Sequence, residues 1–162
     1  MNNKYISVIA LLLHSFLLIT GCEKNNIIIK PGKTLNISIS EITENVSYIP
    51  VILNDIYMEI LAVKAADGTI RTAFNTCERC YETGKGYYIQ EGSLVICQQC
   101  QMYFSIDSIG IQAGGCQPIP IFTEDLKITR KSIRIPYQIL SENTHWFLNW
   151  KAESFSAEEP PH

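Results

Sequence analysis

Histidine is scarce in this chain. The 162 residues include only three, His14, His145 and His162. The residues that follow the two CxxC pairs are Tyr81 and Gln101, so the CxxCH motif that attaches c-type haem is missing. The sequence also lacks an HExxH motif, a Ser/His/Asp set, a Gly-rich phosphate loop and a suitable pair of carboxylates. These absences argue against hydrolytic enzymes and favour a binding or electron-transfer protein over a catalyst.

Positive charge is in deficit as well. Lys and Arg number 13 against 16 Asp and Glu, which gives a net charge of −3. Lys4 lies in the apolar N-terminal leader, so removal of the leader makes the chain more acidic still. Nucleic-acid binding depends on a basic face that neutralises phosphates. No nucleic-acid partner is therefore expected.

The N-terminal apolar run, Tyr5–Ile19, is shorter than the roughly 20 residues that a membrane-spanning helix needs. It follows a short, positively charged start and ends at small residues, as secretory signals do. The segment Leu18–Cys22 resembles a bacterial lipobox, which implies cleavage before Cys22 and lipidation of that residue. We predict a lipoprotein signal peptide over residues 1–21. The mature protein is then extracytoplasmic and is held at a membrane of the bacterial cell envelope by the lipid on Cys22.

Short β-rich runs separated by turn residues follow the leader. Asn54-Asp55 and Asp67-Gly68 each stand between two such runs and predict hairpin turns. Strands at intervals of roughly 8–12 residues are typical of all-β domains. We predict a mainly β fold, a compact single domain of short antiparallel strands over residues 35–150. A tether over residues 22–34 precedes it, and a flexible tail over 151–162 follows.

The sequence pattern also gives bounds for the elements of that domain. The run at Ile27–Ile29 could begin a strand within the tether, Pro118 and Pro120 are interpreted as turn residues, and Trp146–Trp150 as core or a last strand. Pro136–Ser141 predicts a helical turn. The predicted strands are Leu35–Ser40, Val46–Leu53, Tyr57–Lys64, Thr69–Phe74, Gly86–Gln90, Leu94–Cys97, Met102–Ser105, Leu126–Thr129 and Ile133–Ile135.

Five cysteines besides Cys22 lie close together in the sequence. They form two CxxC pairs, with a fifth cysteine after them: Cys77, Cys80, Cys97, Cys100 and Cys116. Two CxxC pairs at such a separation are a metal-site signature. Each tight turn presents two thiolates on one side, and two such knuckles together supply the four sulfurs of a tetrahedral site. Sulfur-only sites suit zinc, iron or an iron–sulfur cluster.

Several alternatives compete with the metal site. Disulfides are common in exported proteins, although five thiols leave one unpaired. Thiol–disulfide exchange at one CxxC pair is a second alternative, although thioredoxin-like motifs lie in a βαβ context. Met102 could add a thioether to a Cu(I) site. The two-knuckle arrangement is similar to that of a Rieske-like or zinc-ribbon-like fold, but a Rieske centre needs two His ligands, and neither knuckle contains one.

Aromatic side chains crowd the cysteine block. Their expected role is to fill the core of a small domain, and a functional variant is that they exclude water from the metal. The residues are Tyr81, Tyr87, Tyr88, Tyr103 and Phe104.

The cysteine block resembles the FtrD-like family of bacterial membrane-associated proteins, which are described as iron–sulfur containing and are in part linked to ferrous-iron uptake. The residues that carry the resemblance are Arg71–Tyr81, Lys85–Tyr87, Val95–Cys100, Tyr103-Phe104 and Ile109–Ile119. It extends from about Leu35 to Leu140 and is most specific over Cys77–Ile119. It departs at Asn75, where an acid is expected, at Gln101, where Gly is common, and at Gln117, where Asn is expected. Many relatives carry the module behind transmembrane helices, where this chain has a lipobox.

The resemblance implies that Cys77, Cys80, Cys97 and Cys100 are metal ligands and that Cys116 is a candidate fifth participant. It also implies iron or an iron–sulfur centre, used for electron transfer or iron handling with a membrane permease or redox partner. The alternatives left open are a structural zinc-binding interaction module and a thiol-redox or copper-handling lipoprotein.

Overall fold

The computed structural model describes residues 26–151. The predicted signal peptide, the lipidation site Cys22 and all but the first residue of the predicted tail lie outside this range.

Strands form three sheets, of order β1-β3-β4-β5-β9, β10-β11-β2 and β6-β7-β8. The strands are β1 (Ile27–Ile28), β2 (Leu35–Ser38), β3 (Ser47–Leu53), β4 (Ile56–Lys64), β5 (Ile70–Cys77), β6 (Tyr88–Glu91), β7 (Leu94–Cys97), β8 (Tyr103–Ser105), β9 (Pro118–Pro120), β10 (Lys127–Ile128) and β11 (Ser132–Ile135). The mainly β prediction is confirmed.

The five-stranded sheet is built around the β3–β4 and β4–β5 hairpins. Asn54 and Asp55 connect β3 to β4 with positive φ angles of 50° and 64°, and Leu53 pairs directly with Ile56. Two consecutive positive φ angles define a type I′ turn, whose twist matches that of the paired strands. The turns predicted from Asn54-Asp55 and Asp67-Gly68 therefore join antiparallel neighbours as expected.

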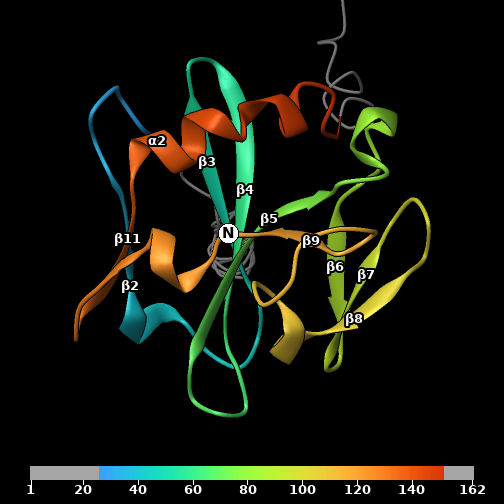
Figure 1. The fold of residues 1–162 in the computed structure, drawn as a ribbon, viewed down its shortest axis with the longest axis horizontal. Coiled ribbons are helices and arrows are strands. Elements are labelled where there is room, and N and C mark those ends of the chain that lie inside the picture. Colours follow the sequence, from blue (N-terminus) through green and yellow to red (C-terminus); the bar gives the residue numbers. More distant parts are fainter. Residues whose placement is uncertain (1–25, 152–162) are drawn as a thin grey trace, which may run out of the picture.

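Strand β4 contributes to two separate cores, one on each face of the sheet. Met58 and Ile60 point into the first core, while Leu61 and Val63 point into the second. A strand that is buried on both faces is apolar without alternation, which explains the uninterrupted run Ile60–Val63. Figure 1 shows β3, β4 and β5 in the middle, with β2 and β11 on one side and β6, β7 and β8 on the other.

The first core lies between the central sheet and the β10-β11-β2 sheet, and the C-terminal helices close it. It includes Leu35 of β2, Ile133 of β11, Leu140 of α2 (Tyr137–Glu142), and Phe147 of the 3-10 helix η5 (Thr144–Phe147). Burying each such side chain contributes about 1.5–3 kcal/mol. This core contains no cysteine, so it forms a frame that does not depend on the cysteine block.

The second core carries the cysteines. Cys77, Cys80 and Cys97 are buried in it beside Tyr88 and Val95. It lies between β4 and β5 of the central sheet and the small β6-β7-β8 sheet. Three of its ten buried residues are cysteines, so the thiols make up a substantial part of the packing in this half of the molecule.

Several segments bear on the sequence-based expectations. Pro118 and Pro120 form the edge strand β9, paired with β5, and are not turn residues. An edge strand tolerates proline because its outer N–H groups need no partner. In Trp146–Trp150, Phe147 and Trp150 are buried in the core, as one of the two interpretations held, whereas Leu148 is exposed. The segment begins within η5 and forms no strand. Strand β2 ends at Ser38, where a 3-10 helix begins, and β1 forms within the predicted tether by parallel pairing with β3.

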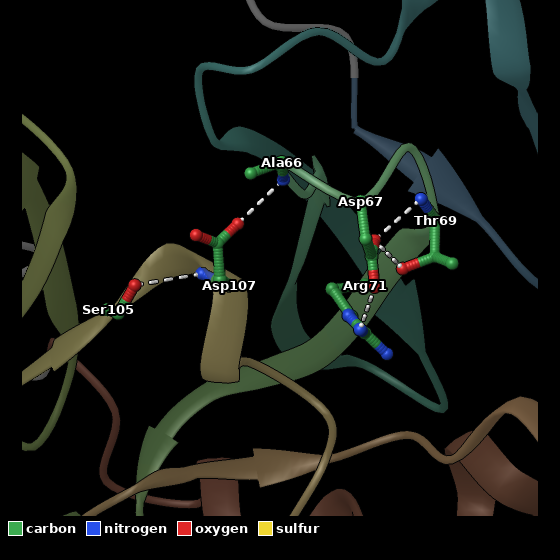
Figure 2. A network of polar contacts seen from close by, with 6 residues as sticks. All are labelled: Ala66, Asp67, Thr69, Arg71, Ser105 and Asp107. Atoms are coloured by element: carbon green, nitrogen blue, oxygen red, sulfur yellow. Dashed lines mark hydrogen bonds and ion pairs between the residues drawn. The ribbon is translucent and has the colours of Figure 1, made fainter.

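Polar contacts hold the small sheet against the central hairpin (Figure 2). The carboxylate of Asp107, just after β8, accepts a hydrogen bond of 2.7 Å from the backbone N–H of Ala66. Asp67 in the β4–β5 turn accepts from Thr69 and pairs with Arg71 at 2.8 Å. The turn is therefore ordered internally and is also attached to the segment that leaves the small sheet.

No helix within residues 26–151 is long and apolar enough to cross a membrane.

Candidate metal centre

Both CxxC turns meet at one point of the second core. The Sγ atoms of Cys77, Cys80, Cys97 and Cys100 all lie within 4.8 Å of one another. Cys77 is the last residue of β5 and Cys97 the last of β7, so each turn begins where a strand ends. A metal–sulfur bond of about 2.3 Å places the sulfurs of one tetrahedral ion roughly 3.8 Å apart. The four thiols therefore form a suitable donor set for a single tetrahedral metal ion after a small contraction.

Backbone hydrogen bonds shape the first turn. The N–H of Cys80 donates to the carbonyl of Cys77 at 3.0 Å, and the N–H of Cys77 donates to Gly86 at 2.6 Å. Gly86 lies so close to Cys80 that an added Cβ would be 2.6 Å from the Cys80 carbonyl carbon. Only glycine at position 86 lets the chain pass this close to the backbone of the first CxxC turn.

The second turn connects β7 to β8. The N–H of Cys97 donates to Met102 at 3.0 Å, and the N–H of Gln101 donates back to Cys97 at 2.9 Å. Gln101 has a φ of 61°, in the left-handed region that favours glycine. Gln101 thus replaces a glycine that is common in the family, but the backbone at this position keeps the left-handed conformation that glycine adopts most easily.

Burial differs among the cysteines. Cys77, Cys80 and Cys97 are buried, Cys100 and Cys116 are half-buried, and all five are free thiols. Cys116 packs against the second core but is not one of the four residues whose sulfurs converge within 4.8 Å. Burial is the main reason that its pKa is raised to about 11, and a hydrogen bond to Cys100 adds to that shift. The fifth cysteine is thus a neighbour of the four-sulfur group and lies outside it.

One thiolate is stabilised by the groups around it. A hydrogen bond from Cys97 is the main reason that the pKa of Cys77 falls to about 4, and the Tyr88 hydroxyl acts in the same direction. Burial raises the pKa of Cys80 to about 12, with its hydrogen bond to Cys77 adding to the shift. The pKa of Cys97 is raised chiefly by its own bond to Cys77. Without metal, Cys77 is therefore ionised at neutral pH while Cys80 and Cys97 keep their protons.

Metal binding at neutral pH is expected to release the protons of Cys80 and Cys97, because a metal binds the thiolate form. Each released proton makes the apparent affinity rise roughly tenfold per pH unit below the raised pKa, so the protons of Cys80 and Cys97 together predict a rise of at least roughly a hundredfold. Zinc titrations by calorimetry, in buffers of different ionisation enthalpy, measure the proton count directly. Heats that do not depend on the buffer would contradict the assigned protonation states.

Two contributors to the site were missed as such by the sequence analysis. Tyr88 is fully buried, and its hydroxyl donates to the Cys116 carbonyl and contacts the Cys77 sulfur. Asn75 accepts a hydrogen bond of 2.7 Å from the Tyr88 N–H and donates to the buried carboxylate of Glu59 at 2.7 Å. An acid at position 75 would face Glu59 with a like charge, whereas the amide can donate to it. Asn75 thus holds Tyr88 in place.

A comparison with protein families places this site among known proteins. The family described as "Membrane iron-sulfur containing protein FtrD-like" matches residues 42–147, which include both CxxC pairs and Cys116. Comparison with curated proteins and with solved structures gives no match. The matched segment covers β3, β4, β5 and β9 of the central sheet, the small sheet and the four converging thiols, and the resemblance stated from the sequence is confirmed. The chain belongs to the FtrD-like family of membrane iron–sulfur containing proteins.

Proposed function

We propose that this chain is a lipid-anchored, extracytoplasmic metal-binding protein that holds iron at Cys77, Cys80, Cys97 and Cys100. It serves electron transfer or iron handling together with a membrane partner such as a permease or a redox protein. The observation that carries the proposal is the convergence of the four thiols within 4.8 Å. Family membership supports iron over zinc, since both metals accept four thiolates.

One side of the site faces the surface. Cys100 is half-buried while the other three ligand candidates are buried. The side chains that follow it, Met102 and Tyr103, are 49% and 65% exposed. Exchange of an electron or a metal ion with a partner requires such an edge, and solvent exposure also helps to set the potential of a sulfur-bound metal. The second knuckle is therefore the side on which we place the partner.

Anaerobically purified protein is expected to contain iron and to be reduced and reoxidised reversibly. Tyr88→Phe should keep the iron but lower its reduction potential, on the order of tens of millivolts, because the Tyr88 hydroxyl stabilises negative charge on the neighbouring Cys77 sulfur and so favours the reduced state. Tyr103→Phe is the matched control, since its side chain is exposed on β8. Potentiometric titration of both variants measures the difference. Equal potentials, or a metal that cannot be reduced, would contradict the redox role.

The lipid anchor has its own test. Cys22→Ser is expected to move the protein from the membrane fraction to the soluble extracytoplasmic fraction while its metal content stays unchanged. The matched control is Cys116→Ser, which should remain with the membrane. Fractionation and intact mass measurement follow both variants. A membrane-bound Cys22→Ser variant would show that another segment or a partner holds the chain at the membrane.

A structural zinc site is the second candidate, and one observation favours it. The second core contains three cysteines among its ten buried residues, so a bound ion would join β5 to the small sheet whether or not it changes oxidation state. Closed four-cysteine zinc sites contribute to folding in this way. Stoichiometric zinc and no reversible reduction in the purified protein would decide for this role.

A further inference from the structure

We propose that the four thiols hold a single metal ion without inorganic sulfide, although the family description names an iron–sulfur protein. The identity of that ion as iron rests on the proposed function, whereas the number of ions rests only on the geometry of the chain. The observation behind it is that no two of the four Sγ atoms are more than 4.8 Å apart.

An iron–sulfur cluster does not fit this spacing. Cysteine sulfurs bound to different irons lie roughly 6 Å or more apart, because two metal–sulfur bonds and the separation of the irons lie between them. A single tetrahedral ion needs roughly 3.8 Å. The observed upper limit on the Sγ–Sγ separations, 4.8 Å, is nearer to the value for a single ion. A cluster would require the two knuckles to move apart.

One short segment resists that movement because it is bonded to both knuckles. The carbonyl of Gly86 accepts from the N–H of Cys77 at 2.6 Å, and the carbonyl of Tyr87 accepts from Gln98 at 2.8 Å. The next residue, Tyr88, pairs with Cys97 across β6 and β7. Residues 86–88 therefore set the distance between the knuckles. Opening the site to the size of a cluster would break these backbone bonds inside a buried core, where unpaired polar groups are costly.

The first knuckle is fixed from its other side as well. Cys77 pairs with Pro118 of β9, and the N–H of Tyr88 donates to the Asn75 side chain at 2.7 Å. Gly86 already contacts the Cys80 backbone more closely than a Cβ would allow. The first turn therefore has a strand, a side chain and a tight glycine contact around it, and the fifth thiol, Cys116, is not needed to complete four ligands.

The test is made on the full-length protein, purified without oxygen from the membrane fraction. Iron, zinc and acid-labile sulfide are measured per chain, and the metal-free protein is then titrated with cobalt(II), whose absorption bands report tetrahedral sulfur ligation. The expected result is one metal ion per chain, no labile sulfide, and a cobalt titration that ends at one equivalent. Cys116→Ser should give the same endpoint.

The outcomes separate this inference from the proposed function. Iron without sulfide supports both, and zinc without sulfide supports the single ion while it refutes the iron assignment. Iron with stoichiometric labile sulfide, or a cobalt endpoint of two or more equivalents, overturns the single ion and leaves the iron function standing.

Discussion

Replacement of Cys97 by serine is expected to lower metal affinity by more than about 100-fold, since loss of an outer-shell partner alone costs 10–100-fold. Cys97 is fully buried and contributes one of the four converging sulfurs. Its hydrogen bond to Cys77 is also the main cause of the low pKa of that thiol. The substitution therefore removes one ligand and weakens a second.

The matched control for this prediction is Cys116→Ser. Cys116 packs against the same core, but its sulfur lies outside the four-sulfur group, so its loss should leave the affinity within a few-fold of the native value. Competition with a chromophoric chelator measures both variants, and circular dichroism shows whether each is folded. Equal losses in the two variants would mean that the ligand set has been assigned wrongly.

Metal removal is expected to loosen the small sheet and leave the rest of the fold in place. Structural metal sites can supply on the order of 10 kcal/mol of folding free energy, and three of the ten buried residues of the second core are cysteines. Hydrogen exchange with and without a chelator should show β6, β7 and β8 losing protection. Strands β3 and β4 should keep most of theirs, because the first core contains no cysteine.

The comparison within one molecule serves as the control for that experiment, since both sheets experience the same chelator. Uniform loss of protection would mean that the two cores unfold together and that the metal stabilises the whole domain. Unchanged protection in β6–β8 would show that the small sheet is stable without metal, which would contradict the structural account of the second core.

The local features of this fold could be predicted from the sequence. The β3–β4 turn follows from Asn54-Asp55, because both residues tolerate a positive φ. The cysteine spacing predicted that the two turns would converge, and they do. The first inference depends on neighbouring residues alone, and the second depends on a cysteine spacing that is itself a metal-site signature. Both could therefore be made before the fold was known.

What the sequence did not reveal depends on contacts between distant segments. β9 forms because it pairs with the free edge of β5, and the residues Pro118 and Pro120 do not by themselves predict a strand. Asn75 lies 16 residues from Glu59 and 13 from Tyr88 in the chain, yet hydrogen bonds join all three. No hydrophobic periodicity or sequence motif marks Asn75 as a buried polar residue. Its role in holding Tyr88 beside Cys77 could therefore be recognised only in the folded structure.

The most direct test of the central claim is X-ray absorption at the metal edge of the purified, full-length protein. The claim is that four sulfurs from two turns bind one metal ion. We predict a first shell of four sulfur neighbours at about 2.3 Å and no metal atom in the next shell. The four-sulfur shell should be lost in Cys97→Ser and retained in Cys116→Ser. A first shell dominated by oxygen or nitrogen, a metal atom in the next shell, or metal-free protein with its cysteines joined in disulfides would contradict the claim.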